Sequence, residues 1–148
     1  MEKNIAVNRR ARHDYFLEEF YEAGIVLTGT EIKSVRKGAV QFKDAYIDFV
    51  NSEAFIRDMH ISQYKEGNIF NHEETRLRKL LLHKREISKL RKACTIKGYT
   101  VVPTRMYLKD GLAKMEIALA RGKALYDKRQ SEKEKDALRE IQKQMKVR

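Results

Sequence analysis

The stretch YTVVPTRMYLKDGLAKMEIALARG, residues 99–122, carries the clearest structural signal in the chain. Two runs rich in strand-forming residues flank Lys109, Asp110 and Gly111, and an Asp-Gly pair between such runs is typical of a tight hairpin turn. Residues 99–122 are therefore predicted to form a β-hairpin. Pro103 is the only proline of the chain. It predicts that its strand lies at a sheet edge or carries a bulge, because proline donates no hydrogen bond to a neighbouring strand.

A second hairpin is predicted upstream, in AYIDFVNSEAFIRDMHI, residues 45–61. Residues 46–50 form one arm, residues 51–53 the turn and residues 54–61 the other arm. Short strands elsewhere bring the count to about six, without a regular alternation of strands and helices. The sequence therefore favours a mainly β fold with some helix. The specific expectation is an OB-like antiparallel β-barrel of about six strands, a frequent scaffold for RNA binding.

Three segments show helical patterns and are expected to flank the barrel. The apolar residues of HDYFLEEFYEAG, residues 13–24, recur at i, i+1, i+4 and i+5, and Gly24 is placed to end that helix. A short strand at 25–28 is followed by a helical turn or two ending at Gly38. The third helix follows the apolar run at 80–82. The polar residues 62–78 are expected to form a loop.

The two ends of the chain differ from this body. Residues 1–12 are predicted to be a basic arm, residues 13–120 the RNA-binding barrel, and residues 121–148 a basic tail. The tail holds ten Lys/Arg and five Asp/Glu, and its apolar stripe is too narrow for a core helix. We expect a tail that is disordered when free and helical when an anionic partner receives it. The alternative is a solvated tail without a role.

Composition and charge narrow the class of partner. The 148 residues carry a formal net charge of +11, which favours a polyanion, with nucleic acid first and an anionic membrane surface as the competitor. The opening residues contain no apolar signal segment and no stretch approaches the length of a membrane span, so no membrane partner is expected. Cys94 is the only cysteine, which fits a reducing cytoplasm.

Catalytic signatures are absent from the sequence. The four histidines make no metal-ligand spacing, no HExxH or GxSxG motif is present, and no glycine-rich phosphate loop occurs. We therefore expect neither catalytic residues nor a metal, cofactor or small-molecule substrate. An RNA-cleaving or RNA-modifying enzyme is the rival hypothesis in another class.

Clusters of basic residues are the stronger signal, and aromatic residues lie beside two of them. Cations beside aromatic rings are a common means of gripping non-duplex RNA, because they combine phosphate neutralisation with base stacking. The alternative for each cluster is a solvated charged face. The predicted RNA-binding cations are Arg9, Arg10, Arg12, Arg76, Arg78, Lys79 and Lys84.

Three long stretches resemble one family in order along the chain. They are NRRARHDYFLEEFYEAGIVLTGTEIKSVRKG, RKLLLHKREI and GYTVVPTRMYLKDGLAKMEIALARGKALYDKR. The family is that of tmRNA-binding small protein B, also called SsrA-binding protein. Two local departures occur: Glu74 stands where the family often has a proline, and Ala124 where it often has a second lysine.

The resemblance implies a non-catalytic OB-like barrel with three helices. It implies binding to the tRNA-like domain of transfer-messenger RNA and delivery of that RNA to bacterial ribosomes stalled without a stop codon. The RNA-contact positions it carries over are Glu22 in YEAG and Leu81 and His83 in LLLH. Tail positions expected to bind the ribosome, in the small-subunit decoding region and mRNA channel, are Lys123, Tyr126, Asp127, Lys128 and Arg129.

The chemistry of these residue types agrees with the implied roles. A carboxylate such as Glu22 can accept hydrogen bonds from base amino groups or ribose hydroxyls, while Leu81 and His83 can cover and stack on a base. From the residues alone, a surface charge at Glu22 and a core position for Leu81 would be preferred. A general barrel-type RNA binder is the alternative function.

Overall fold

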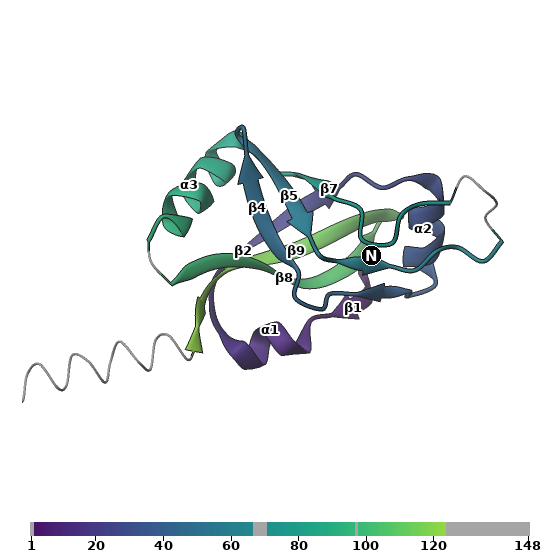
Figure 1. The fold of residues 1–148 in the computed structure, drawn as a ribbon, viewed down its shortest axis with the longest axis horizontal. Helices are drawn as coiled ribbons and strands as arrows, with labels where there is room; N and C mark the ends of the chain where they lie inside the picture. The colour runs from purple at the N-terminus through teal and green to yellow at the C-terminus, as the bar shows by residue number, and fades with distance from the viewer. Residues whose placement is uncertain (1, 67–70, 97, 124–148) are drawn as a thin grey trace, which may run out of the picture.

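The fold is described from a computed structural model, over residues 2–66, 71–96 and 98–123. The chain forms a seven-stranded antiparallel sheet in the order β1-β8-β9-β2-β7-β5-β4, and a two-stranded sheet of β3 and β6 (Figure 1). The prediction of a mainly β fold with three helices is confirmed for the described residues. The elements are β1 (Glu2–Val7), α1 (Arg9–Asp14), β2 (Tyr15–Ile25), α2 (Gly29–Arg36), β3 (Val40–Gln41), β4 (Tyr46–Val50), β5 (Glu53–Arg57), β6 (His60–Ile61), β7 (Arg78–Leu81), α3 (Lys84–Cys94), β8 (Tyr99–Lys109) and β9 (Leu112–Gly122).

The predicted hairpin at 99–122 is confirmed and forms two internal strands of the main sheet. Asp110 and Gly111 have φ of 51° and 80°, left-handed values that a two-residue hairpin turn uses to match the strand twist. The strand register shifts between Pro103 and Arg105, so Pro103 lies at a bulge. Pro103 also lies beyond the part of β8 that pairs with β1, because that pairing ends at Arg105.

The second predicted hairpin is confirmed in its first part. The strands β4 and β5 pair through a turn at Asn51 and Ser52, both with positive φ, and Val50 lies opposite Glu53. The expected second arm, residues 54–61, is divided at Asp58, which has a φ of 63°. Its end, β6, pairs with β3 instead.

The predicted helix at 13–24 is wrong, because most of this segment is the strand β2. This strand pairs with β9 along its length and with β7 at its end, so tertiary pairing decides its structure over local periodicity. A register shift between Leu17 and Phe20 explains why apolar residues recur there without strict alternation. Gly24 ends no helix. It lies opposite Leu81 in the sheet.

The predicted N-terminal arm is also corrected by the structure. Residues 2–7 are β1, which pairs with β8 at the edge of the main sheet, and α1 follows directly. Asn8 joins the two elements: its Oδ1 accepts from the Ala11 backbone N–H at 3.2 Å and its Nδ2 donates to the Pro103 carbonyl at 2.8 Å. Residues 2–12 are therefore built into the fold, and α1 crosses the expected boundary between residues 12 and 13.

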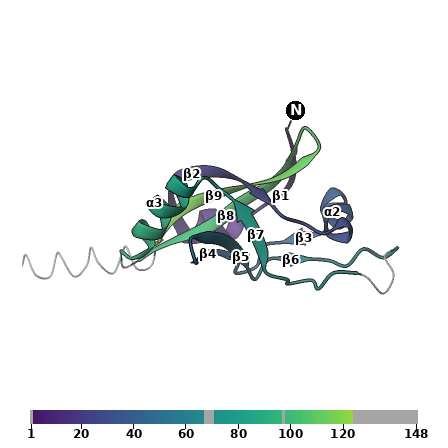
Figure 2. The ribbon, with the colours of Figure 1, turned by 90° about the horizontal axis from the view of Figure 1, so that it is seen from above.

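The helices α2 and α3 agree with the sequence patterns and lie at opposite ends of the long hairpin (Figure 2). Helix α2 begins with a capping box of Thr28 and Glu31, and Gly38, with a φ of 76°, follows its end. Helix α3 buries Ile87 and Leu90 in the core. No helix in the described ranges combines the length and apolarity that crossing a membrane requires.

Candidate nucleic-acid interface

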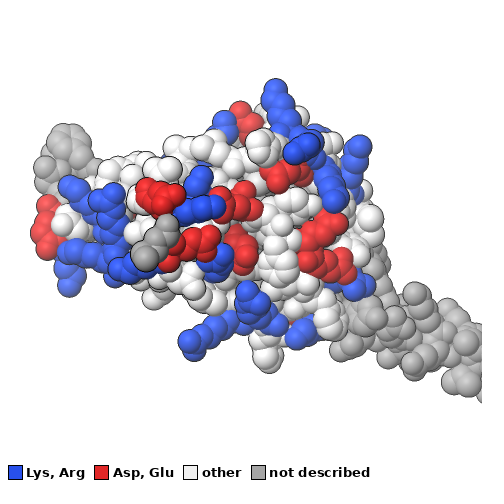
Figure 3. Space-filling view, turned by 180° about the vertical axis from the view of Figure 1, so that it is seen from behind, with Lys and Arg blue, Asp and Glu red and all other residues white. Residues whose placement is uncertain are grey.

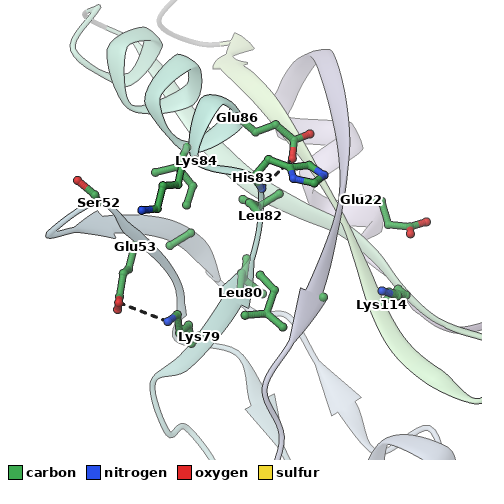
Figure 4. Close-up of a pocket in the computed structure, with 14 residues that line it drawn as sticks. Glu22, Ser52, Glu53, Lys79, Leu80, Leu82, His83, Lys84, Glu86 and Lys114 are labelled. Carbon is green, nitrogen blue, oxygen red and sulfur yellow. Dashed lines mark hydrogen bonds and ion pairs between the residues drawn. The ribbon is translucent and has the colours of Figure 1, made fainter.

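A surface groove of about 490 Å³ brings together half of the predicted RNA-binding residues (Figure 4). It lies between β2, β7, the β4–β5 turn and the start of α3, and is called here the central groove. Five of the ten predicted residues line it, together with a lysine of β9 that the sequence did not point to. These six residues are Glu22, Lys79, Leu81, His83, Lys84 and Lys114.

Strand alternation in β7 decides which leucine reaches the groove surface. Leu80 is 1% exposed and belongs to the core, whereas its neighbour Leu81 is 54% exposed. Leu81 pairs with Gly24 of β2, and a Cβ at Gly24 would lie only 3.3 Å from the Cβ of Leu81. The missing side chain at Gly24 therefore gives Leu81 its space. Leu81 is therefore a surface residue, whereas its residue type alone predicted a core position.

Glu22 is held on the groove side of β2 by two donors from β8. The Tyr107 hydroxyl donates to Oε2 at 2.5 Å, and the Lys109 ammonium lies 3.4 Å from the same oxygen. The Tyr107 hydrogen bond lowers the pKa of the Glu22 carboxyl, partly opposed by burial and assisted by Lys109. Within the described residues Oε1 has no hydrogen-bond partner. This oxygen of an ionised carboxylate is thus available as an acceptor.

Tyr107 is the residue that sets this geometry, and no pattern in the sequence identified it. Its ring is buried at 2% exposure, and burial raises the pKa of its hydroxyl, with the hydrogen bond to Glu22 adding to the rise. The hydroxyl therefore stays a donor at any physiological pH. The guanidinium of Arg105 lies over the same ring, 4.1 Å from its centre, which further fixes the tyrosine.

His83 lies at the junction of β7 and α3, two residues after Leu81. It is the N-cap of α3, and its backbone N–H donates to the Glu86 carboxylate at 3.1 Å. Its imidazole is exposed at the groove, near Leu82 and Glu86 (Figure 4). An exposed leucine and an imidazole so close together form a surface on which an unstacked base can lie.

The cations of the central groove differ in how far they are already neutralised. Lys79 lies 3.3 Å from Glu53 across the β5–β7 pair, so part of its charge is compensated. Lys84 has no acidic partner within the described residues. Figure 4 shows Ser52, Glu53 and Lys84 on one side of the groove and Glu22 and Lys114 on the other. The groove therefore offers both an acceptor and cations to a ligand.

The prediction that Arg78 contacts RNA is wrong, because the structure buries this residue completely. Its side chain is 0% exposed and is ion-paired through Nε with Glu31, which is also fully buried. Its remaining donors reach the carbonyls of Met59 at 2.9 Å and Glu74 at 3.0 Å. A guanidinium with all its donors used inside the protein has none for phosphate. It joins α2 to β7 instead.

Arg76 belongs to the same structural cluster. Its guanidinium donates to Glu31 at 2.6 Å and to the Val26 carbonyl at 3.3 Å, with a third of the side chain still exposed. Burial alone would raise the pKa of Glu31, but the hydrogen bonds from Arg76, the Thr28 backbone and Arg78 lower that pKa to about 2. Arg76 does not line the central groove. Its guanidinium instead holds the Glu31 carboxylate.

The three arginines of α1 do not line the central groove. Arg10 pairs with Asp44 at 2.9 Å and with Asp14 at 3.4 Å, while Arg9 and Arg12 are exposed without an acidic partner in the described ranges. At the end of β9, the Lys123 ammonium lies 5.5 Å from the centre of the Phe16 ring. These cations form a separate basic region. The other tail positions predicted to bind the ribosome, Tyr126, Asp127, Lys128 and Arg129, lie outside the described residues.

Positive charge is distributed over the molecule and not concentrated on one uniformly basic face. Figure 3 shows acidic and basic side chains interspersed over the centre of the face opposite to that of Figure 1, with Lys and Arg gathered toward the α3 end and also toward the α2 end. At that end the ammonium groups of Lys33 and Lys37 lie 5.5 and 4.7 Å from the centre of the Tyr64 ring. In the described part of the chain, no group of three or more His, Cys, Asp or Glu side chains is placed to hold a metal ion.

Comparison with known proteins finds one family over nearly the whole chain. The family model described as SmpB protein matches residues 5–147. SsrA-binding protein of Bacillus cereus (strain AH820) is 58% identical over 139 residues, 94% of this chain and 90% of that protein. The SsrA-binding proteins of Shouchella clausii and Clostridium kluyveri are 53% and 56% identical over 146 residues, 99% of this chain and 94% and 93% of theirs.

A solved structure extends the likeness to three dimensions. It is described as "tmRNA-SmpB: a journey to the center of the bacterial ribosome" and superposes with a TM-score of 0.69 at 45% sequence identity. The match covers 80% of this chain and 83% of the other. The resemblance carried by the three long motifs is thereby confirmed. Because a family model spans nearly all of its length and its relatives are more than half identical, the chain belongs to the SmpB protein family.

Proposed function

We propose that this protein is the RNA-binding adaptor of trans-translation. It binds the tRNA-like domain of transfer-messenger RNA and delivers that RNA to ribosomes stalled on messages that lack a stop codon. Membership of the SmpB family and relatives named SsrA-binding protein support this function. So does the match to a structure described by its tmRNA, SmpB and ribosome.

The central groove is the observation that carries the proposal. Three residues that the family resemblance implies as RNA contacts, Glu22, Leu81 and His83, come from distant positions and line one groove. Glu22 offers an oriented acceptor, Leu81 and His83 offer a stacking surface, and lysines supply phosphate neutralisation. These are the elements by which proteins distinguish the loops of a folded RNA from a regular duplex.

The finer architecture forms part of the same proposal. The sheet curls into an OB-like barrel, which the packing of β4 against β8 supports, since these strands lie far apart in the sheet order. Because β9 extends to Gly122, the tail begins after this residue; it enters the empty mRNA channel of a stalled ribosome and there becomes helical. A channel occupied by message excludes it, so the tail reports on vacant space. The protein acts in the cytoplasm, without catalysis or a cofactor.

Competitive binding tests this function. We expect the full-length protein to bind the tRNA-like domain of transfer-messenger RNA at least tenfold more tightly than a duplex RNA of the same length at the same salt concentration. Equal affinity for both RNAs would contradict the proposal and favour a general RNA-binding protein. Shortening of the RNA during incubation with divalent metal would instead indicate a nuclease.

A further inference from the structure

A second groove, of about 410 Å³, continues from the central groove along α3 and is called here the α3 groove. The two grooves share Ser52, Lys84 and Ile87, so a ligand leaving one passes directly into the other. Six of its seven lining residues carry a cation or a hydroxyl. The polar residues that line it are Ser52, Lys84, Ser88, Arg91, Lys92 and Thr95.

Helical periodicity explains why these residues meet. Lys84, Ser88 and Arg91 are spaced i, i+4 and i+7, which places them on one side of α3. The apolar residues Ile87 and Leu90 are buried in the core. From Lys84 to Thr95 the helix rises about 16 Å at 1.5 Å per residue, long enough to face several successive phosphates.

The cations of the α3 groove are uncompensated, unlike most lysines nearby. Lys84, Arg91 and Lys92 are exposed and have no acidic partner within the described residues. Lys89, on the other side of the same helix, lies 3.3 Å from Glu19. Three uncompensated positive charges in one groove are unfavourable to one another, and an anion that binds there relieves the repulsion. The Ser52 and Ser88 hydroxyls add donors suited to phosphate and ribose oxygens.

We propose that the α3 groove binds the sugar-phosphate backbone of the RNA whose base lies against Leu81 and His83. The proposal rests on the proposed function and extends it, because it assigns the direction in which the RNA strand leaves the central groove. Glu22, Leu81 and His83 select the RNA, whereas Lys84, Arg91 and Lys92 hold the nucleotides that follow. The backbone contact supplies affinity without sequence preference.

Two double variants on one helix test this assignment. Arg91→Ala with Lys92→Ala removes two charges from the α3 groove, and Arg85→Ala with Lys89→Ala removes two charges of the same helix that do not line this groove. Affinity of the full-length proteins for the tRNA-like domain is measured from 50 to 300 mM salt. We expect the first variant to bind several-fold more weakly and to flatten the slope of log K against log salt by about 1 to 1.5, as loss of two single-strand phosphate contacts does. The second variant should change the slope by less than half of that.

The comparison distinguishes the possible failures. An equal change in both variants, or no change in the first, would overturn the α3 groove as a phosphate site while leaving the selectivity of the wild type intact. A wild-type protein that does not prefer the tRNA-like domain over duplex RNA would remove the proposed function, and this inference with it. Thermal unfolding followed by circular dichroism, with equal melting temperatures for the three proteins, verifies that the substitutions act on binding.

Discussion

At the scale of single residues, the site depends on positions that look unremarkable in the sequence. Glu22 is one of 21 acidic residues, and it differs from most of them because a buried tyrosine from β8 fixes one of its oxygens. The resemblance to a family selected Glu22, Leu81 and His83, whereas residue type alone favoured surface and core roles. Arg78 shows the opposite error. Its charge suggested RNA, but its partner Glu31 lies 47 positions away, a pairing that no local pattern reveals.

The first prediction concerns the carboxylate of Glu22. Glu22→Ala should weaken binding to the tRNA-like domain about tenfold, because one hydrogen-bonded discrimination is worth about 1–3 kcal/mol. It should leave the salt dependence nearly unchanged, since a carboxylate neutralises no phosphate. Filter binding at several salt concentrations measures both. Glu18→Ala, on the same strand but paired with Arg121 at 2.7 Å outside the groove, is the matched control. A steep change of the salt slope in Glu22→Ala would assign this residue a different role.

At the scale of elements, turn residues predicted both hairpins correctly, whereas hydrophobic periodicity predicted some helices correctly and one strand wrongly. The two hairpins were predictable because Asp110-Gly111 and Asn51-Ser52 have few conformational alternatives. The strand β2 was not, since its aromatic residues fit a helical face and only pairing with β9 and β7 makes it a strand. Likewise β1 is polar over its first half and is a strand because it pairs with the edge of β8. Local sequence carries no record of such a partner.

The second prediction concerns the ion-paired cluster that joins α2 to β7. Glu31 has its pKa lowered from 4.5 to about 2, so it binds protons less readily folded than unfolded. Its contribution of about 3 kcal/mol to the unfolding free energy is therefore present above pH 4.5 and lost as the pH falls toward 2. Urea unfolding at pH 6, 4 and 3 should show this loss in the wild type and a smaller one in Glu31→Gln.

The control for this pH dependence is Glu53→Gln. Glu53 also pairs with a cation of β7, Lys79, but its side chain is 48% exposed. Water screens such a pair, so its removal should leave the pH dependence like that of the wild type. If Glu31→Gln and Glu53→Gln lost stability in parallel with the wild type as the pH fell, the Glu31 cluster would not be the source.

At the scale of the whole molecule, the fold places functions in separate regions. The central groove and the α3 groove lie along β2, β7 and α3, while the α1 arginines and Lys123 lie elsewhere. Total charge and composition correctly favoured a nucleic-acid partner. They could not indicate where on the surface the separate basic regions lie, because a net charge carries no spatial information. The order of the three motifs along the chain indicated the family. Only the sheet topology shows which residues meet in the central groove.

The third prediction separates the body from the tail. A chain ending at Gly122 should keep binding to the tRNA-like domain within about threefold of full length, because the residues that form both grooves remain. It should lose peptide tagging on stalled ribosomes, which the proposed function assigns to the tail. A translation reaction on a message without a stop codon measures tagging. Lost RNA affinity, or tagging at the full-length level, would contradict the division.

The strand β9 has a mechanical consequence. Lys114 lies at the central groove and Gly122 ends the strand eight residues later, about 26 Å away at 3.3 Å per residue. Hydrogen bonding to β8 on one side and to β2 on the other makes this strand rigid. In the proposed function, the distance between the RNA-binding groove and the start of the ribosome-binding tail is therefore set by backbone geometry, and force on one of them is transmitted to the other through β9.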